Sequence, residues 1–288
     1  LKMNEDGTAM LFNAAADTGS GVLSAHASMV AEAIGLKYED VLVMTGDTDC
    51  APFDGPTHAS RGLYGAGKAV VKAAEEIKQK LLEWAARVFA CGIEEIEIKN
   101  SRVYVHNNPE KSMSVSELVK IGHFSGWGLA MASTSVRPNA CPPHFVAIFF
   151  IVDVDTKTGK VDIVKAISAV DVGTVINQNN VEGQMVGGVH MGLGFALMED
   201  FKLDPVTGKP LNPNFADYKI LTFMDMPEVE KIIAHTYEPT GPFGAKAIGE
   251  GVTNPVAAAV GNAIFDACGV RIRDLPITAE KILRGLKQ

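Results

Sequence analysis

The residue with the clearest chemical signature is Glu250, in the glycine-rich segment from Gly241 to Gly251. Glycines flank this carboxylate on both sides, and an apolar helical pattern follows it. Glycine lets the backbone come close to a ligand, and burial of a carboxylate favours proton transfer by raising its pKa. A carboxylate near a helix start is also common for structural reasons, because it compensates the positive end of the helix. The residues alone leave a catalytic base and a structural carboxylate open.

A second candidate is Gln184, in a helical pattern from about Asn180 to Asp200 that carries glycines at positions 183, 187, 188, 192 and 194. Each glycine costs a helix about 1 kcal/mol relative to alanine. Such a surface lets another backbone or a flat ligand come close, and the Gln184 amide can both donate and accept hydrogen bonds toward a heterocycle. Tight helix–helix packing is the alternative explanation of the glycines.

Three segments bring glycine and small polar residues to the start of a predicted helix, namely 17–21, 57–60 and 241–251. Backbone N–H groups at a helix start have no intrahelical partner and lie at its positive end, so they suit a phosphate or an anionic cofactor. Ordinary capping turns have a similar composition, and none of the three segments is a P-loop or a dinucleotide fingerprint. Cofactor contacts and structural caps are therefore both open for each segment.

The elements that must position these residues alternate without the regular order of a doubly wound sheet, which predicts an α+β (mixed α/β) fold. We expect two parts, each pairing a small sheet with helices: 1–124, then a connecting segment at 125–144, then 145–288 with Glu250. The most apolar window, Phe145 to Val154, has the length of a buried strand. Expected strands are 9–14, 41–45, 96–98, 103–105, 145–155, 160–170 and 232–236, and expected helices are 22–34, 60–90, 114–121, 180–200 and 254–268.

The composition argues against several classes of partner. A net charge of -8, with no run of basic residues longer than a pair, argues against nucleic acid. No apolar stretch approaches the roughly 18 residues that cross a bilayer, so we expect no membrane insertion. The absence of a signal-peptide pattern favours the cytoplasm. The four cysteines are scattered without a CxxC pair, which indicates reduced thiols and no protein-bound zinc or iron–sulfur cluster.

Five spaced motifs together resemble the molybdopterin-binding region of the xanthine dehydrogenase and aldehyde oxidase family of molybdenum hydroxylases. In chain order they are Thr57 to Arg61, Asp153 to Gly159, Asp171 to Asn177, Gln184 with Gly188 to Gly194, and Gly241 to Glu250. The resemblance runs from about Asn4 to Leu283. In its organisation the chain is most similar to the medium molybdopterin subunit of nicotinate dehydrogenase, an enzyme whose molybdenum region is split between two polypeptides.

The resemblance implies a molybdenum atom held by molybdopterin in its cytosine dinucleotide form, with no protein side chain as a metal ligand. It makes Glu250 the catalytic base and places Gln184 toward the pterin or the oxo group of the metal. The family often has Gln where this chain has Ser20, so the resemblance supports only backbone contacts at that position. The implied cofactor-binding residues are Gln184, Ala59, Ser60, Ser20, Gly21, Gly244, Lys246 and Gly249.

The implied enzyme is a molybdenum-dependent dehydrogenase or hydroxylase. It inserts a water-derived oxygen at an electron-poor carbon of an N-heterocycle of the nicotinate type and passes electrons to Fe-S and FAD subunits. The earlier half of the family's molybdenum region has no counterpart here, so we expect a larger molybdopterin subunit to carry it and activity to require these partners. A purine or aldehyde substrate is the alternative within the family. A non-catalytic cofactor-insertion or scaffold module is the alternative from another class.

Overall fold

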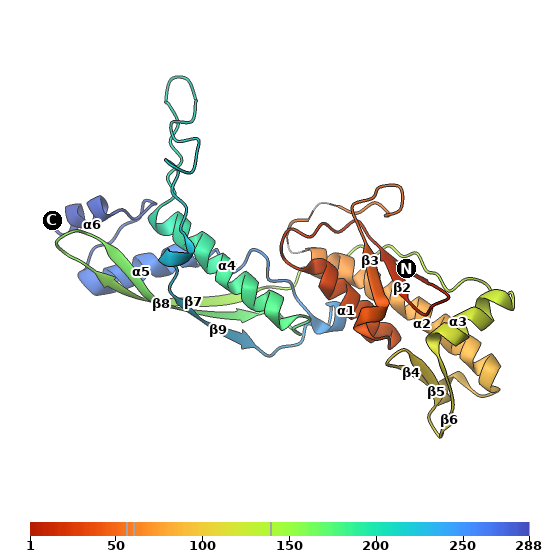
Figure 1. Ribbon diagram of the computed structural model, residues 1–288. Coiled ribbons are helices and arrows are strands. Elements are labelled where there is room, and N and C mark those ends of the chain that lie inside the picture. The colour runs from red at the N-terminus through yellow and green to blue at the C-terminus, as the bar shows by residue number, and fades with distance from the viewer. Residues whose placement is uncertain (56, 60, 139, 288) are drawn as a thin grey trace. The chain divides into compact units, whose positions relative to one another are not determined.

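The computed structural model describes residues 1–55, 57–59, 61–138 and 140–287, which form two compact units (Figure 1). The first unit comprises Leu1–Pro142, Thr174–Asn177 and Tyr237–Ala247, and the second comprises Pro143–Gly173, Gln178–Thr236 and Ile248–Gln288. Two short segments from the second half of the sequence thus belong to the first unit. Both units combine helices with small sheets, which confirms the expected α+β class.

The first unit is built from two three-stranded sheets and three helices. One sheet has the order β1-β2-β3, and its strands β2 and β3 are parallel because helix α1 connects them. The other sheet is an antiparallel meander of β4, β5 and β6. The elements are β1 (Lys2–Met3), β2 (Ala9–Phe12), α1 (Val22–Ile34), β3 (Val41–Met44), α2 (Gly67–Phe89), β4 (Ile96–Lys99), β5 (Arg102–Val105), β6 (Asn108–Ser114) and α3 (Val115–Phe124).

Helix α2 organises the core of the first unit. Its apolar residues recur at helical spacing, and Val70, Ala74, Ile77 and Leu81 are all buried against α1 and the sheets. The expected helix at 60–90 is confirmed over Gly67–Phe89, but a π-helical turn, Gly62–Ala66, precedes it. Such turns are often found at functional sites, and this one directly follows the predicted cofactor loop at 57–60.

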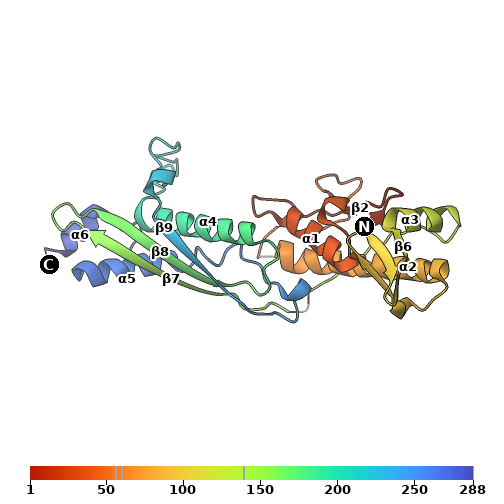
Figure 2. The ribbon, with the colours of Figure 1, turned by 60° about the horizontal axis from the view of Figure 1, so that its bottom comes forward.

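The second unit is a three-stranded sheet with two long helices and a short one. Strands β7 and β8 form the expected hairpin through the turn at 155–159, and β9 adds to β8 in parallel. Helices α4 and α5 pack against each other along the sheet (Figure 2). The elements are β7 (Phe145–Val154), β8 (Val161–Asp171), α4 (Gln178–Leu197), β9 (Glu228–Ala234), α5 (Val256–Cys268) and α6 (Ala279–Gly285).

The structure departs from the sequence expectations at three elements. Strand β6 and helix α6 were not expected, and strand β7, expected to be buried, leaves alternate side chains such as Phe149 exposed. Helix α6 has a sequence signal, because the Thr278 side chain accepts a hydrogen bond from the Lys281 N–H and so caps the helix. No helix within the described ranges is both long enough and apolar enough to cross a membrane.

Candidate functional site

Glu250 lies in a turn that runs from Gly249 to the start of α5, and its side chain is exposed. Among the described residues, none forms an ion pair or hydrogen bond with its carboxylate. The helix itself begins six residues later, at Val256, so Glu250 does not cap it. The next residue, Gly251, packs directly on the His144 ring, where any side chain at position 251 would collide with the imidazole. Backbone packing therefore fixes the turn while the Glu250 carboxylate stays accessible.

The glycines of α4 differ in how closely other atoms pack against them. Gly188 and Gly192 face the chain that enters α5, and a Cβ atom at position 188 would lie 2.6 Å from the Val252 Cβ. A Cβ atom added at position 183 or 187 would have no neighbouring atom within 4 Å. Helix packing, one of the two explanations left open by the sequence, therefore accounts for Gly188 and Gly192. Gly183 and Gly187 leave the surface beside Gln184 open, and Gly194 packs against the Glu199 side chain at the end of the helix.

The same packing brings the Glu250 turn and Gln184 to one region of the second unit. Val252 is two residues after Glu250 and rests on Gly188, which is about one helical turn after Gln184. Gln184 is half-buried, and its neighbour Glu182 is tied to Lys231 of β9 by a 2.9 Å ion pair. The helix that carries Gln184 is thus anchored to the sheet on one side and to the Glu250 turn on the other.

The predicted residues Gly244 and Lys246 lie in the segment Tyr237–Ala247 of the first unit, which has an unusual backbone. Phe243 and Gly244 both have positive φ angles, 52° and 80°. The Gly244 carbonyl accepts hydrogen bonds from the Thr174 N–H at 2.8 Å and the Glu238 N–H at 2.9 Å. A side chain at Gly244 would also collide with the Tyr237 ring, so only glycine fits this position.

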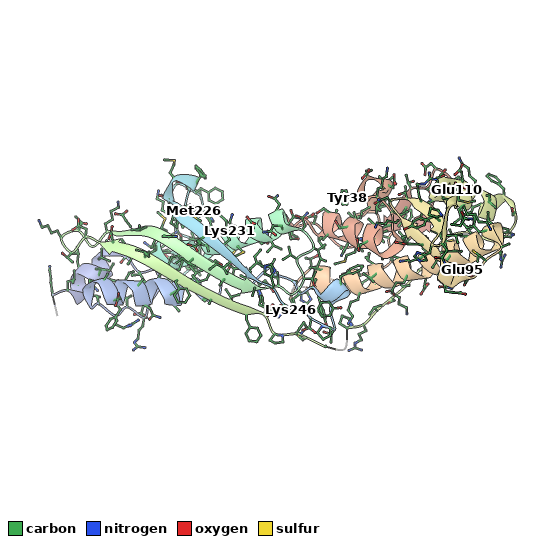
Figure 3. All side chains as sticks on the ribbon, turned by 90° about the horizontal axis from the view of Figure 1, so that it is seen from below. Tyr38, Glu95, Glu110, Met226, Lys231 and Lys246 are labelled. Atoms are coloured by element: carbon green, nitrogen blue, oxygen red, sulfur yellow. The ribbon has the colours of Figure 1, made fainter. Side chains whose placement is uncertain are left out.

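Lys246, labelled in Figure 3, is a buried cation with 8% of its surface exposed. Burial of a lysine is costly unless partners compensate it. The segment that carries it is anchored to the π-helical turn, because the Thr240 and Tyr64 hydroxyls hydrogen-bond at 2.7 Å. Lys246 and the left-handed backbone of residues 243–244 thus belong to the same unit as the loop that precedes α2.

The predicted turn at 17–21 leads directly into helix α1. The Asp17 carboxylate accepts hydrogen bonds from the N–H groups of Gly19 and Gly21, both at 3.0 Å. Gly21 is the N-cap of α1, in the left-handed region with a φ of 72°, and it supplies no side-chain cap. Ser20 is half-buried within this turn. Gly21, as a glycine, contributes no side-chain cap to the first turn of α1, and the N-terminal end of this helix carries its positive dipole.

A buried histidine connects α1 to the loop that carries Ala59. His26 is fully buried, and its Nε2 lies 3.0 Å from the Gly62 carbonyl in the π-helical turn. Its Nδ1 lies 3.3 Å from the Asn13 amide nitrogen. Burial lowers the pKa of His26, so the ring is neutral at pH 7, donates from Nε2 and accepts at Nδ1. Ala59, exposed with a φ of 49°, lies three residues before Gly62, whereas Ser60 lies outside the described residues.

We expect acid to weaken the first unit through His26. Its pKa in the folded state is below the unfolded value of about 6.5, so the unfolded state binds more protons below that pH. The stabilisation is complete above pH 6.5 and is lost as the pH falls toward the folded pKa, by at most about 1.4 kcal/mol per pH unit. Denaturant unfolding at pH 7.5 and 5.5 measures this loss. The loss should shrink in His26→Gln, which keeps a donor but does not titrate, and an equal loss in both proteins would contradict the assignment.

The eight predicted site residues that are described fall into two groups. Gln184, Gly249 and Glu250 belong to the second unit, and Ser20, Gly21, Ala59, Gly244 and Lys246 belong to the first. A cavity of about 420 Å³ in the first unit is lined by none of them. The sequence reasoning missed His144 beneath Gly251 and the link from His26 to Gly62. Neither has a local sequence signal, because each contact joins residues that are far apart in the chain.

Comparison with known proteins identifies the family of this chain. Residues 1–227 match the model of the molybdopterin cofactor-binding domain, which is more than three quarters of the chain. The chain belongs to that family. Glu250 and the segment Tyr237–Ala247 follow the matched range, but relatives align beyond it. The resemblance to the xanthine dehydrogenase and aldehyde oxidase family of molybdenum hydroxylases is thereby confirmed.

The relatives of this molybdopterin-binding chain are much longer than the chain itself. It is 35% identical to the xanthine dehydrogenase molybdenum-binding subunit of Escherichia coli O157:H7, over 98% of this chain and 38% of that protein. It is 30% identical to the carbon monoxide dehydrogenase large chain of Afipia carboxidovorans, over 86% of this chain and 31% of that one. The structure of quinoline 2-oxidoreductase from Pseudomonas putida 86 matches with a TM-score of 0.91 and 27% identity, over 100% of this chain and 38% of its own. The chain spans between 31% and 38% of the length of these proteins.

The residues of the first unit fit a phosphate-bearing pterin. Such a cofactor needs amide donors and positive charge, and the α1 amides without a side-chain cap and the buried Lys246 are groups of these kinds. The positive φ angles at Ala59, Phe243 and Gly244 let backbone groups turn toward a ligand. The chemistry of the donor set therefore agrees with the molybdopterin cofactor of the family.

Proposed function

We propose that this chain forms one half of the active site of a molybdenum hydroxylase, with Glu250 as the catalytic base. The observation that carries the proposal is the Glu250 turn, in which an exposed carboxylate is held between two glycines. Packing of Val252 on Gly188 and of Gly251 on His144 fixes this turn next to the helix of Gln184. A carboxylate on a rigid backbone can be aimed at a bound substrate, which is what general-base catalysis requires.

The cofactor proposed for this site is molybdopterin in its cytosine dinucleotide form with molybdenum, which when bound supplies the two-electron redox centre. The helix start at Ser20 and Gly21, just before α1, would lie against its phosphates, together with the charge of Lys246. Gln184 would hydrogen-bond the pterin side through an amide that both donates and accepts. Ala59, Ser60, Gly244 and Gly249 would let the backbone come close to it.

In this proposal Glu250 takes a proton at one carboxylate oxygen during the attack of a water-derived oxygen on the substrate. The carboxylate is exposed in this chain and is therefore accessible to a bound substrate. A positioned base of this kind typically contributes about a hundred- to ten-thousand-fold to the rate.

An N-heterocycle of the nicotinate type is the proposed substrate. Support comes from the structural likeness to an enzyme that is named for quinoline, another N-heterocycle. Fold alone does not determine the substrate, and the 35% identity to a xanthine dehydrogenase subunit favours a purine as the second candidate. The proposed partners are a larger molybdopterin subunit with the rest of the site, an Fe-S subunit and a FAD subunit. The proposed location is the cytoplasm.

The test of this proposal is purification of the native complex through a tag on this chain. We expect one molybdenum and one cytosine dinucleotide per chain, and faster reduction of the metal by nicotinate than by xanthine or benzaldehyde. We expect no molybdenum in the chain expressed alone, because the proposed cofactor site is shared with the partner. A loaded and active isolated chain would contradict the shared site, and a complex without molybdenum would favour the scaffold alternative.

A further inference from the structure

Strand β7 has a sequence that is typical of a strand covered on both faces. Its residues read Phe-Val-Ala-Ile-Phe-Phe-Ile-Val-Asp-Val, so that only Asp153 is polar. A strand with one face in water normally alternates apolar and polar residues, whereas a strand between two layers is apolar throughout. The sequence of β7 therefore indicates a second layer over this sheet.

The pairing of the strands assigns each side chain to a face. Phe149 is opposite Ile167 of β8, and Ile167 is opposite Glu230 of β9, so these three share one face. Phe150, Ala166 and the residues in register with them point to the other face. The first face is called face A, and its apolar residues are Phe145, Ala147, Phe149, Ile151, Ile167, Ala169, Ile232 and Ala234.

Helix α4 covers the face opposite to face A, and α5 packs against α4 and against β7. Lys231 is in register with Ser168 on that opposite face, and Lys231 pairs with Glu182 of α4. Ile148, Ala166 and Ser168 are buried there. On face A, by contrast, the exposed fractions are 62% for Phe149, 52% for Ile151 and 46% for Ile232. Within the described residues, the sheet has one covered face and one bare apolar face.

Face A has the anatomy of a protein interface. Its apolar residues include the aromatic side chain of Phe149, and the Lys165–Glu230 ion pair at 2.6 Å lies beside them on strands β8 and β9 of the same face. Interfaces typically combine an apolar, aromatic core with a polar rim. Contiguous apolar surface on an open sheet is also an aggregation hazard, which proteins avoid by covering it.

We infer that face A is the docking surface for the larger molybdopterin subunit. This inference rests on the proposed function. The occupant is argued from length: the matched relatives align with 98–100% of this chain, and this chain accounts for only 38% of theirs. These relatives therefore carry more than half of their length outside the region that corresponds to this sheet and its unit. The inferred partner surface is apolar at its centre, to match Phe149, Ile151 and Ile232.

The test compares two variants with the same substitution in the purified complex. Phe149→Glu places a charge at the centre of face A, where the side chain is exposed and contributes little to the fold. Phe265→Glu is the matched control, because Phe265 is also an exposed phenylalanine, at 43%, and it lies on α5, outside face A. We expect Phe149→Glu to weaken association with the larger subunit at least thirty-fold, equivalent to about 2 kcal/mol, and Phe265→Glu to leave it unchanged.

Dilution of each purified complex, followed by mass photometry, gives the dissociation constants, and circular dichroism checks that each variant chain is folded. A folded Phe149→Glu chain that no longer co-purifies with the larger subunit also supports the inference. Wild-type association of Phe149→Glu, or equal weakening by both variants, would overturn it. So would a loss restricted to self-association, which would assign face A to a second copy of this chain. A wild-type complex that contains no molybdenum but is dissociated by Phe149→Glu would overturn the proposed function and leave the docking surface standing.

Discussion

Replacement of Glu250 by glutamine in the complete complex is expected to lower turnover by about a hundred- to ten-thousand-fold, or about 3–5 kcal/mol of barrier. Glutamine keeps the volume and much of the hydrogen bonding of glutamate, but it cannot accept the proton. The side chain is exposed and has no protein partner among the described residues, so the fold and the molybdenum content should remain. Rapid mixing with substrate should show the loss in the step in which substrate reduces the metal.

The control for this experiment is Glu280→Gln. Glu280 is an exposed carboxylate of the same unit, paired with Arg284 one turn later in α6, and its replacement should leave turnover unchanged. Electron transfer from reduced enzyme to the acceptor should be the same in wild type and Glu250→Gln, because the proposed base takes no proton in that step. If Glu250→Gln loses molybdenum, the carboxylate has a structural role. If it reduces at the wild-type rate with full molybdenum, Glu250 is not the base.

Local patterns predicted most of the helices and strands, and they failed where long-range contacts decide the structure. Helix α1 was expected at its observed bounds, because a glycine stands at each end of its helical pattern. In the structure, Gly21 and Gly35 both adopt left-handed conformations that begin and end the helix. Strand β6, by contrast, begins with Asn108 and Pro109 and carries charged residues, so its pairing with β5 has no periodic signal. The apolar run of β7 predicted burial, which the bare face contradicts for this chain and which the inferred partner would restore.

The candidate site was predicted by residue type and motif order rather than by geometry. The Glu250 turn stood out because glycines surround a carboxylate, but the sequence could not show that Val252 rests on Gly188. The glycines of α4 looked alike in sequence, and only the structure separates those that pack against α5 from those that stay open. His26 stands in no sequence motif, and its hydrogen bond to Gly62 connects segments 36 residues apart.

That separation of the α4 glycines leads to opposite expectations for two neighbouring alanine substitutions. Gly188→Ala would put a Cβ atom 2.6 Å from the Val252 Cβ and 3.4 Å from the Thr253 nitrogen. Because both contacts are close to the backbone, the turn must move, and overpacking of this kind costs about 1–3 kcal/mol. The better helix propensity of alanine offsets about 1 kcal/mol of that cost, so we expect a net loss of up to about 2 kcal/mol in the free energy of unfolding.

Gly187→Ala is the matched control, because it is the same substitution one residue earlier in α4 and its Cβ would have no atom within 4 Å. It should raise the free energy of unfolding by up to about 1 kcal/mol. Denaturant unfolding of the two variant chains tests the difference in sign. In the complete complex, Gly188→Ala should also lower turnover by about a hundred-fold, since a shift of about 1 Å in Val252 moves the Glu250 turn away from its working position. Equal stability of the two variants would mean that Val252 yields without moving the turn, and wild-type turnover of Gly188→Ala would show that the Gly188 contact does not position Glu250.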